Sequence, residues 1–166
     1  MRLEVDCAAG RLRGAGHDMA CVIGRSGRIA AALKREGDGA TPLGTWPIRG
    51  VLLRPDRVAA PALSLPWRWI GRADGWSDDP ADPAYNRPVR HPHGFSAERL
   101  WREDGLYDVI VVLGHNDAPP VPGAGSAIFL HCWRDQAATE GCVAVARDAL
   151  LALLPALRPG DSIAIG

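Results

Sequence analysis

The chain has 166 residues, which is enough for one domain with a hydrophobic core and too few for two well-formed domains. Nineteen Lys and Arg balance nineteen Asp and Glu, so the chain lacks the positive excess on which non-specific binding to nucleic acid or anionic membranes depends. The apolar fraction of 47% excludes a wholly disordered chain, and nineteen Gly with fourteen Pro favour short strands and turns over long helices.

The N-terminal residues 1–7 contain no apolar run of the kind that forms the centre of a signal peptide. We therefore expect a cytoplasmic protein, or a periplasmic one if the N-terminus is truncated. No segment approaches the roughly 18 to 20 apolar residues of a membrane span, so we expect no membrane insertion. Without an export signal, we expect reduced thiols at the four cysteines, which are Cys7, Cys21, Cys132 and Cys142.

In the first third of the chain, short apolar or alternating runs bounded by glycine predict strands at 3–7, 19–23 and 28–33. Segment 36–45 is too rich in glycine for a regular element and is expected to form a shaped loop. A further strand is predicted at 46–53. This part of the chain is therefore predicted to form a meander of strands.

The middle segment 71–94 carries four prolines and shows neither helical nor strand periodicity, so it is either a linker or a long ordered surface loop. Its Trp76 and Tyr85 favour ordering against the body of the domain. Apolar and β-branched runs predict buried strands at 107–113 and 126–132.

The C-terminal segment holds the one predicted helix. Leucines spaced along 147–154 predict a short amphipathic helix that ends near Pro155. A last strand is predicted at 162–165. The elements together indicate a mainly β domain.

Residues 139–143, Thr-Glu-Gly-Cys-Val, place a cysteine directly after a glycine between a predicted strand and the helix. A turn at this point would present the thiol of Cys142 to a substrate. A nucleophilic thiol needs a base and benefits from backbone N–H groups that receive developing negative charge, so a catalytic Cys142 is expected to have a depressed pKa. His131, eleven positions upstream at the end of a strand, is the candidate base. If His131 faces the site, strand alternation turns Cys132 away from it.

These residues also have other interpretations. Free cysteine often behaves as a small buried hydrophobe, and a histidine in an apolar strand is often structural. A disulfide between Cys132 and Cys142 is disfavoured by the missing export signal. A zinc site would use His91 and His93 with His115 or His131, but the Pro-rich loop around His91 gives the first two histidines no common face.

The motifs resemble a known family. Residues 128–131 (Ile-Phe-Leu-His) and 139–143 resemble the His-to-Ser/Thr-x-Gly-Cys signature of the YkuD-type L,D-transpeptidase catalytic domain. Residues 36–44 are similar to the Thr-Pro-x-Gly turn of that family. Three further segments resemble a compact subgroup of the family: 75–80, 85–88 and 125–131. The resemblance as a whole covers about residues 19–165.

The resemblance implies a single-domain twisted β-sandwich with one or two short helices, and activity on peptidoglycan. In such enzymes the cysteine attacks the carbonyl of an L-centre, usually that of meso-diaminopimelate, releases D-Ala and passes the acyl group to an amine or to water. The resemblance implies Cys142 as the nucleophile and His131 as the base. It places Gly141 with Cys142 as backbone donors to the oxyanion and Thr139 beside the site, and it implies no metal or organic cofactor.

The sequence departs from the family pattern at two positions. Glu140 stands where the family often has His, and Ala144 stands where it often has Arg or Asn. Substrate carboxylate contacts are then expected from elsewhere, with Arg134, Asn116 and Arg87 as candidates by charge or hydrogen-bonding capacity.

With no export route visible in the sequence, water is the expected acceptor. We therefore expect an L,D-carboxypeptidase that trims D-Ala from tetrapeptide stems or recycled muropeptides to leave tripeptides. An L,D-transpeptidase that cross-links the cell wall or exchanges D-amino acids is the alternative within this class. A domain that binds peptidoglycan peptides without turnover is the alternative outside it. In each case the expected partners are peptidoglycan stem peptides or muropeptides.

Overall fold

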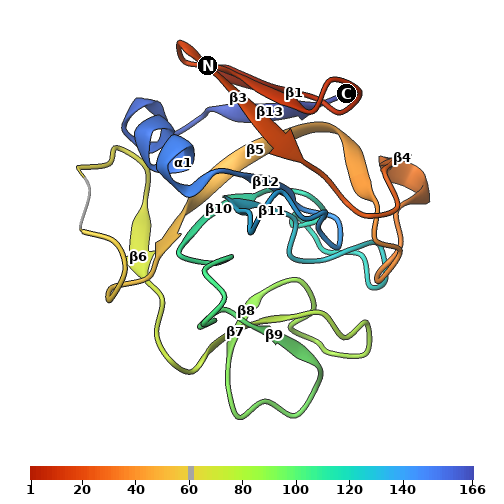
Figure 1. Ribbon diagram of the computed structural model, residues 1–166. Coiled ribbons are helices and arrows are strands. Elements are labelled where there is room, and N and C mark those ends of the chain that lie inside the picture. Colours follow the sequence, from red (N-terminus) through yellow and green to blue (C-terminus); the bar gives the residue numbers. More distant parts are fainter. Residues whose placement is uncertain (60–61) are drawn as a thin grey trace.

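The computed structural model describes residues 1–59 and 62–166 and arranges them mainly as β-strands (Figure 1). No helix in this described part is long and apolar enough to cross a membrane. The helical elements are α1 (Arg147–Leu153) and two short 3-10 turns, η1 (Ala31–Leu33) and η2 (Leu154–Ala156). The strands are β1 (Arg2–Asp6), β2 (Arg11–Gly14), β3 (His17–Val22), β4 (Arg28–Ala30), β5 (Thr41–Leu53), β6 (Trp67–Trp69), β7 (Asp74–Ser77), β8 (Pro88–Arg90), β9 (Ala97–Arg99), β10 (Val109–Leu113), β11 (Phe129–Cys132), β12 (Val143–Val145) and β13 (Ser162–Ile165).

Two strands, β3 and β5, each pair with different neighbours along their two halves and so join the two parts of the main sheet. The first half of β5 pairs with β4 and β13, and its second half pairs with β10 and β6. Strand β3 pairs with β2 through residues 17–20 and with β12 through residues 21–22. The order β10-β11-β12-β3-β2-β1-β13-β5 therefore closes on itself where β10 pairs with β5.

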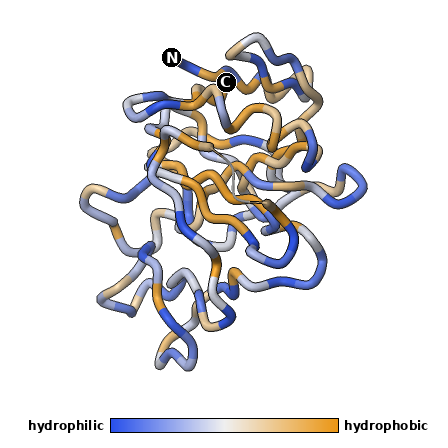
Figure 2. The backbone as a smooth tube through the Cα atoms, turned by 90° about the vertical axis from the view of Figure 1, so that its left-hand side faces the viewer, coloured by the Kyte–Doolittle hydropathy of each residue, from blue (hydrophilic) through white to orange (hydrophobic). Residues whose placement is uncertain are grey.

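The main hydrophobic core fills the space inside this ring. Alternation along β1 turns Leu3 and Val5 inward, and Leu150 and Leu153 of α1 close one end of the same cluster. The helix is short because Pro155, which cannot donate a helical hydrogen bond, stands in η2 directly after it. Figure 2 shows the hydrophobic segments gathered in the central strands and the hydrophilic ones in the loops.

A second, smaller cluster lies on the outer face of β10 and β11. Leu130 and Cys132 belong to the main core, whereas Phe129 belongs to the second cluster together with Cys142. His131 shares the face of Phe129, since its ring meets Tyr107 of the same cluster edge-on at 5.2 Å between centroids. The predicted alternation of His131 and Cys132 is therefore confirmed.

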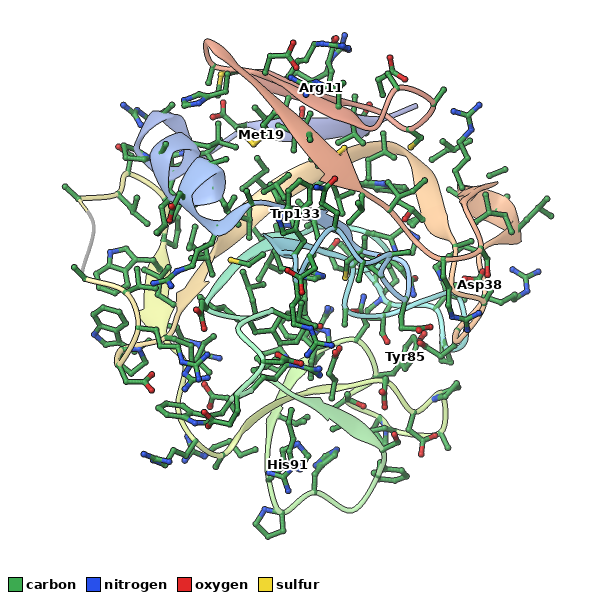
Figure 3. All side chains as sticks on the ribbon, viewed as in Figure 1. Arg11, Met19, Asp38, Tyr85, His91 and Trp133 are labelled. Atoms are coloured by element: carbon green, nitrogen blue, oxygen red, sulfur yellow. The ribbon has the colours of Figure 1, made fainter. Side chains whose placement is uncertain are left out.

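The three-stranded sheet β8-β7-β9 lies over this outer face, below β10 and β11 in Figure 1. The expectation that 71–94 lacks strands is wrong, because β7 and β8 form within it; both are too short to show periodicity, and Pro88 begins β8. The expected ordering is confirmed. Trp76 meets Phe129 edge-on at 5.1 Å, and Tyr85, labelled in Figure 3, is only 3% exposed.

The other predicted elements agree with the structure apart from details at their ends. Strand β5 begins at Thr41, inside the segment predicted as a loop, because residues 41–47 pair with β4 and β13. Pro42 and Gly44 are unusual in strands, so this segment showed no strand pattern in the sequence. Strand β2 has a single buried residue, Leu12, and gave no recognisable pattern. Residues 28–33 form β4 followed by η1 rather than one strand.

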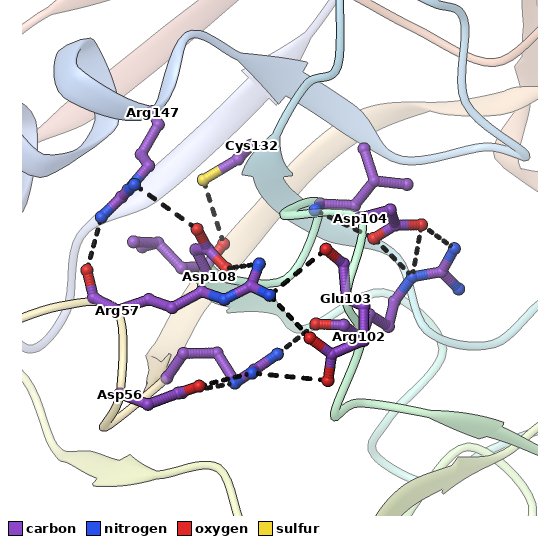
Figure 4. A network of polar contacts seen from close by, with 11 residues as sticks. Asp56, Arg57, Arg102, Glu103, Asp104, Asp108, Cys132 and Arg147 are labelled. Atoms are coloured by element: carbon purple, nitrogen blue, oxygen red, sulfur yellow. Dashed lines mark hydrogen bonds and ion pairs between the residues drawn. The ribbon is translucent and has the colours of Figure 1, made fainter.

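Segment 100–108 has no regular structure and is fastened to the end of β5 by buried charges (Figure 4). Arg54 is fully buried, binds both carboxylate oxygens of Asp56 at 2.9 Å and donates to the carbonyl of Arg102. Arg57 binds Asp108 at 3.2 Å. These contacts fix the backbone of a segment that contributes three side chains to the cavity described next.

Candidate active site

A cavity of about 520 Å³ brings together residues that are far apart in the sequence. Its walls come from the loop that precedes β5, from β9, from segment 100–108, and from the chain on either side of the 131–142 loop. Three of the predicted site residues line it, namely His131, Thr139 and Cys142, and so does Glu140.

Cys142 stands immediately before β12, which runs parallel to β11 in a register that pairs Val143 with Leu130. This register places its sulfur beside the start of β11. The Cys142 Sγ accepts the N–H of Phe129 at 3.3 Å and donates to the carbonyl of Ala127 at 3.1 Å. The side chain is buried at the inner end of the cavity.

The turn that carries Cys142 requires glycine at position 141. Gly141 has φ +139°, and a Cβ there would stand 3.0 Å from the carbonyl oxygen of Ala40. The hydroxyl of Thr139 accepts the Gly141 N–H at 3.1 Å and donates to the Cys142 carbonyl at 2.7 Å. Thr41 donates to the same carbonyl at 3.4 Å. The expected supply of the Gly141 N–H to an oxyanion is therefore not seen, because that donor is already bound to Thr139.

His131 lies at the end of β11 and is 4% exposed. Its Nδ1 is 2.7 Å from the carbonyl oxygen of Cys132, so in the neutral ring Nδ1 carries the proton and Nε2 is the free base. Every residue has a backbone carbonyl, so no sequence pattern reveals this orienting group.

Burial favours the uncharged forms of both Cys142 and His131. It raises the pKa of Cys142 to about 12; the negative charge of Glu98 adds to this, and the Phe129 N–H opposes it. Burial lowers the pKa of His131 to about 4, against the effects of the Cys132 and Leu106 backbone groups. The expected depressed pKa of Cys142 is thus contradicted, and the resting pair is a thiol and a neutral imidazole.

Alkylation of Cys142 by iodoacetamide is therefore expected to rise about tenfold per pH unit from pH 7 to pH 10 without a plateau, because only the thiolate reacts. The rate is followed by mass spectrometry of the peptide that contains Cys142. A His131→Gln variant should give the same pH profile, since no ion pair exists to be lost. A plateau below pH 8 that disappears in the variant would show a thiolate–imidazolium pair instead.

The side chains expected to bind a substrate carboxylate do not line the cavity. Arg134 is exposed on the loop after β11. Arg87 and Asn116 bind backbone carbonyls, at 2.6 Å and 2.9 Å respectively, and hold surface loops in place. The cations that do line the cavity among the described residues are Lys34 and Arg102.

Lys34 is the lining residue that sequence reasoning overlooked most clearly. It is 2% exposed, and its ammonium group binds Asp38 and the carbonyl of Arg35. A Cβ on Gly141 would lie 3.6 Å from its Nζ, and its charge lowers the pKa of Cys142. No motif in the sequence singles out this lysine, so only the fold shows that it lies beside the turn.

Asn86 joins the three-stranded sheet to the wall of the cavity. Its Oδ1 accepts the indole N–H of Trp76 at 2.9 Å and the backbone N–H of Ala127 at 3.1 Å. Its Nδ2 donates to the carbonyls of His115 and Asn116, at 3.1 Å and 2.7 Å. Because the carbonyl of Ala127 receives the Cys142 thiol, Asn86 positions the backbone against which the sulfur rests.

The disulfide and zinc interpretations find no support in the described residues, whereas the burial of Cys142 in the second cluster is also what a structural cysteine would show. All four cysteines are free, so no bond joins Cys132 to Cys142. Within residues 1–59 and 62–166 no three His, Cys, Asp or Glu side chains are grouped so as to hold a metal. His93 instead binds Asp82 at 2.7 Å. Glu140, at the position where the family often has His, forms an exposed ion pair with Arg25 at 2.9 Å.

Comparison with known proteins agrees with this arrangement. The family model of the L,D-transpeptidase catalytic domain, YkuD, matches residues 3–165, from β1 to β13. Comparison with curated proteins and with solved structures gives no match.

Proposed function

The chain belongs to the YkuD family of L,D-transpeptidase catalytic domains, which act on peptidoglycan peptides, and from this we propose that it is a cysteine-dependent L,D-carboxypeptidase. Its substrate would be a tetrapeptide stem, cleaved between the L-centre of meso-diaminopimelate and the terminal D-Ala. The observation that carries the proposal is the buried thiol of Cys142, which follows a glycine turn and lines the same cavity as His131, a neutral imidazole whose Nδ1 is held by the Cys132 carbonyl.

In the proposed first step the sulfur of Cys142 forms a bond to the substrate carbonyl carbon while the thiol proton passes to Nε2 of His131. A concerted transfer suits this site, because neither partner is charged at rest. In this proposal the N–H of Cys142 stabilises the oxyanion together with the positive charge of Lys34, whose Nζ would lie 3.6 Å from a Cβ on the neighbouring Gly141.

Collapse of the tetrahedral intermediate breaks the C–N bond, and His131 returns the proton to the amine of the leaving D-Ala. A thioester on Cys142 remains. Water entering the space that D-Ala vacates then attacks the thioester carbonyl and gives a proton to His131. As the C–S bond breaks, His131 passes that proton to the sulfur, which restores the thiol and the neutral imidazole as the tripeptide is released. The polar lining around Ser126 and Glu98 offers hydrogen-bond partners for that water.

The proposal is tested by mass spectrometry of a disaccharide-tetrapeptide incubated with the protein, with and without an added D-amino acid. Loss of one alanine, absent in a Cys142→Ala variant, supports the carboxypeptidase. Exchange of the terminal residue for the added D-amino acid would show a transpeptidase instead. Binding of the peptide with neither change would contradict turnover and leave a peptide-binding domain.

A further inference from the structure

Three carboxylates line the cavity without an ion-pair partner in the described residues: Glu36, Asp78 and Glu98. They come from the loop before β5, the residue after β7, and β9. The two cations of the lining form their ion pairs with carboxylates outside it, Lys34 with Asp38 and Arg102 with Asp104, although the charge of Arg102 also acts on Glu98. This acidic wall, defined as these three carboxylates, has no cation of the described chain in direct ion-pair contact with it.

The three charges act on one another. Burial raises the pKa of Glu98, the Tyr107 hydroxyl and the positive charge of Arg102 lower it, and the charges of Asp78 and Glu36 raise it. The hydroxyl of Tyr107 donates to Glu98 at 2.5 Å, and that of Tyr85 donates to Glu36. A neutral hydroxyl orients a carboxylate but does not balance its charge. The acidic wall therefore favours binding of a positive group from outside the chain.

Two buried polar atoms of the lining also lack a partner. Oδ1 of Asp78 and Oγ of Ser126 are enclosed and make no hydrogen bond, and Ser126 is 8% exposed. Buried polar atoms are nearly always hydrogen-bonded in folded proteins. Their presence in the same cavity as the acidic wall indicates that a ligand with several donors completes it.

The kind of cation follows from how these acceptors are spread. They are not grouped as metal ligands, since no three His, Cys, Asp or Glu side chains in the described chain could hold one ion. A group with three N–H donors and a full positive charge suits separated acceptors. We propose that the acidic wall binds a primary ammonium group of the substrate, so that the enzyme selects stem peptides with a free amine close to the scissile bond. This inference rests on the proposed function of the same cavity.

The test compares two tetrapeptides that differ only in whether the side-chain amine of the third residue is free or acetylated. For the wild-type protein, kcat/KM for D-Ala release at pH 7 should be at least about 30-fold higher for the free amine, because charge-assisted hydrogen bonds would be lost on acetylation. In Glu98→Gln and Glu36→Gln variants, which keep an acceptor for each tyrosine, the ratio should fall below about 3-fold. Asp148→Asn, the same charge change on the exposed face of α1, should leave the ratio unchanged.

Equal kcat/KM for the two peptides, with release still dependent on Cys142, would overturn the inference and leave the proposed function intact. If neither peptide is cleaved, the proposed function fails, and calorimetric titration of both peptides into the Cys142→Ala variant decides the inference alone. At least tenfold tighter binding of the free amine would support the acidic wall. Equal binding, or none, would overturn it.

Discussion

Replacement of His131 by Gln is expected to lower kcat/KM for D-Ala release at pH 7 by at least about 1,000-fold. With a pKa of about 12, the thiol of Cys142 is almost wholly protonated at that pH, so attack depends on a base that takes the proton as the C–S bond forms. Gln fills a similar volume but accepts no proton. The rate of D-Ala release by purified variants, measured by mass spectrometry, gives the result.

The pH profile separates a lost base from a disturbed fold. Wild-type activity requires unprotonated His131, whose pKa is about 4, so it should fall only as the pH approaches that value. Activity of the variant should instead rise about tenfold per pH unit above neutrality, following the thiolate. His115→Gln is the matched control, because His115 is also buried with a pKa lowered to about 4 but lies outside the cavity lining. Equal losses in both variants would contradict the role of His131.

Replacement of Asn86 by Gly is expected to lower the free energy of unfolding by about 3 kcal/mol or more, and kcat at least about tenfold. Four hydrogen bonds disappear, and the buried groups they satisfied, including the indole N–H of Trp76 and the N–H of Ala127, lose their partner. Glycine tolerates the φ of +55° at this position, so backbone strain does not enter. Urea denaturation and the rate of D-Ala release measure the two effects.

Asn116→Gly provides the control for this prediction. Asn116 also has a positive φ, of 49°, and its side chain makes three hydrogen bonds to backbone groups, but in a more exposed loop. Water can replace those bonds, so a loss of about 1 kcal/mol and unchanged kcat are expected. A similar stability loss in both variants, with kcat unaffected in Asn86→Gly, would show that Asn86 does not position the carbonyl beneath the thiol.

Sequence patterns predicted the parts of this molecule that depend on local or nearby residues. The apolar runs around β10 and β11 and the leucines of α1 indicate burial directly. The opposite orientation of His131 and Cys132 follows from strand geometry alone. The proximity of His131 to Cys142 depends on parallel pairing across one short loop, which their spacing suggested.

The remaining features depend on contacts between distant segments, which spacing does not encode. The short strands of the three-stranded sheet become regular only by pairing with one another, and Asn86 acts through partners from three segments. Lys34 and Glu98 line one cavity although they are 64 positions apart in the sequence (98 − 34). The orientation of His131 depends on a backbone carbonyl, and the raised pKa of Cys142 depends on burial by the whole fold.

The central claim is that Cys142 forms a covalent acyl intermediate in the cavity it shares with His131. Rapid mixing of the protein with excess tetrapeptide, an acid quench within seconds and intact-protein mass spectrometry would detect that thioester. We predict a mass increase equal to the substrate less D-Ala, located by digestion on Cys142, and absent in Cys142→Ala. Release of D-Ala by the Cys142→Ala variant, or an acyl group on Cys7, Cys21 or Cys132, would contradict the account.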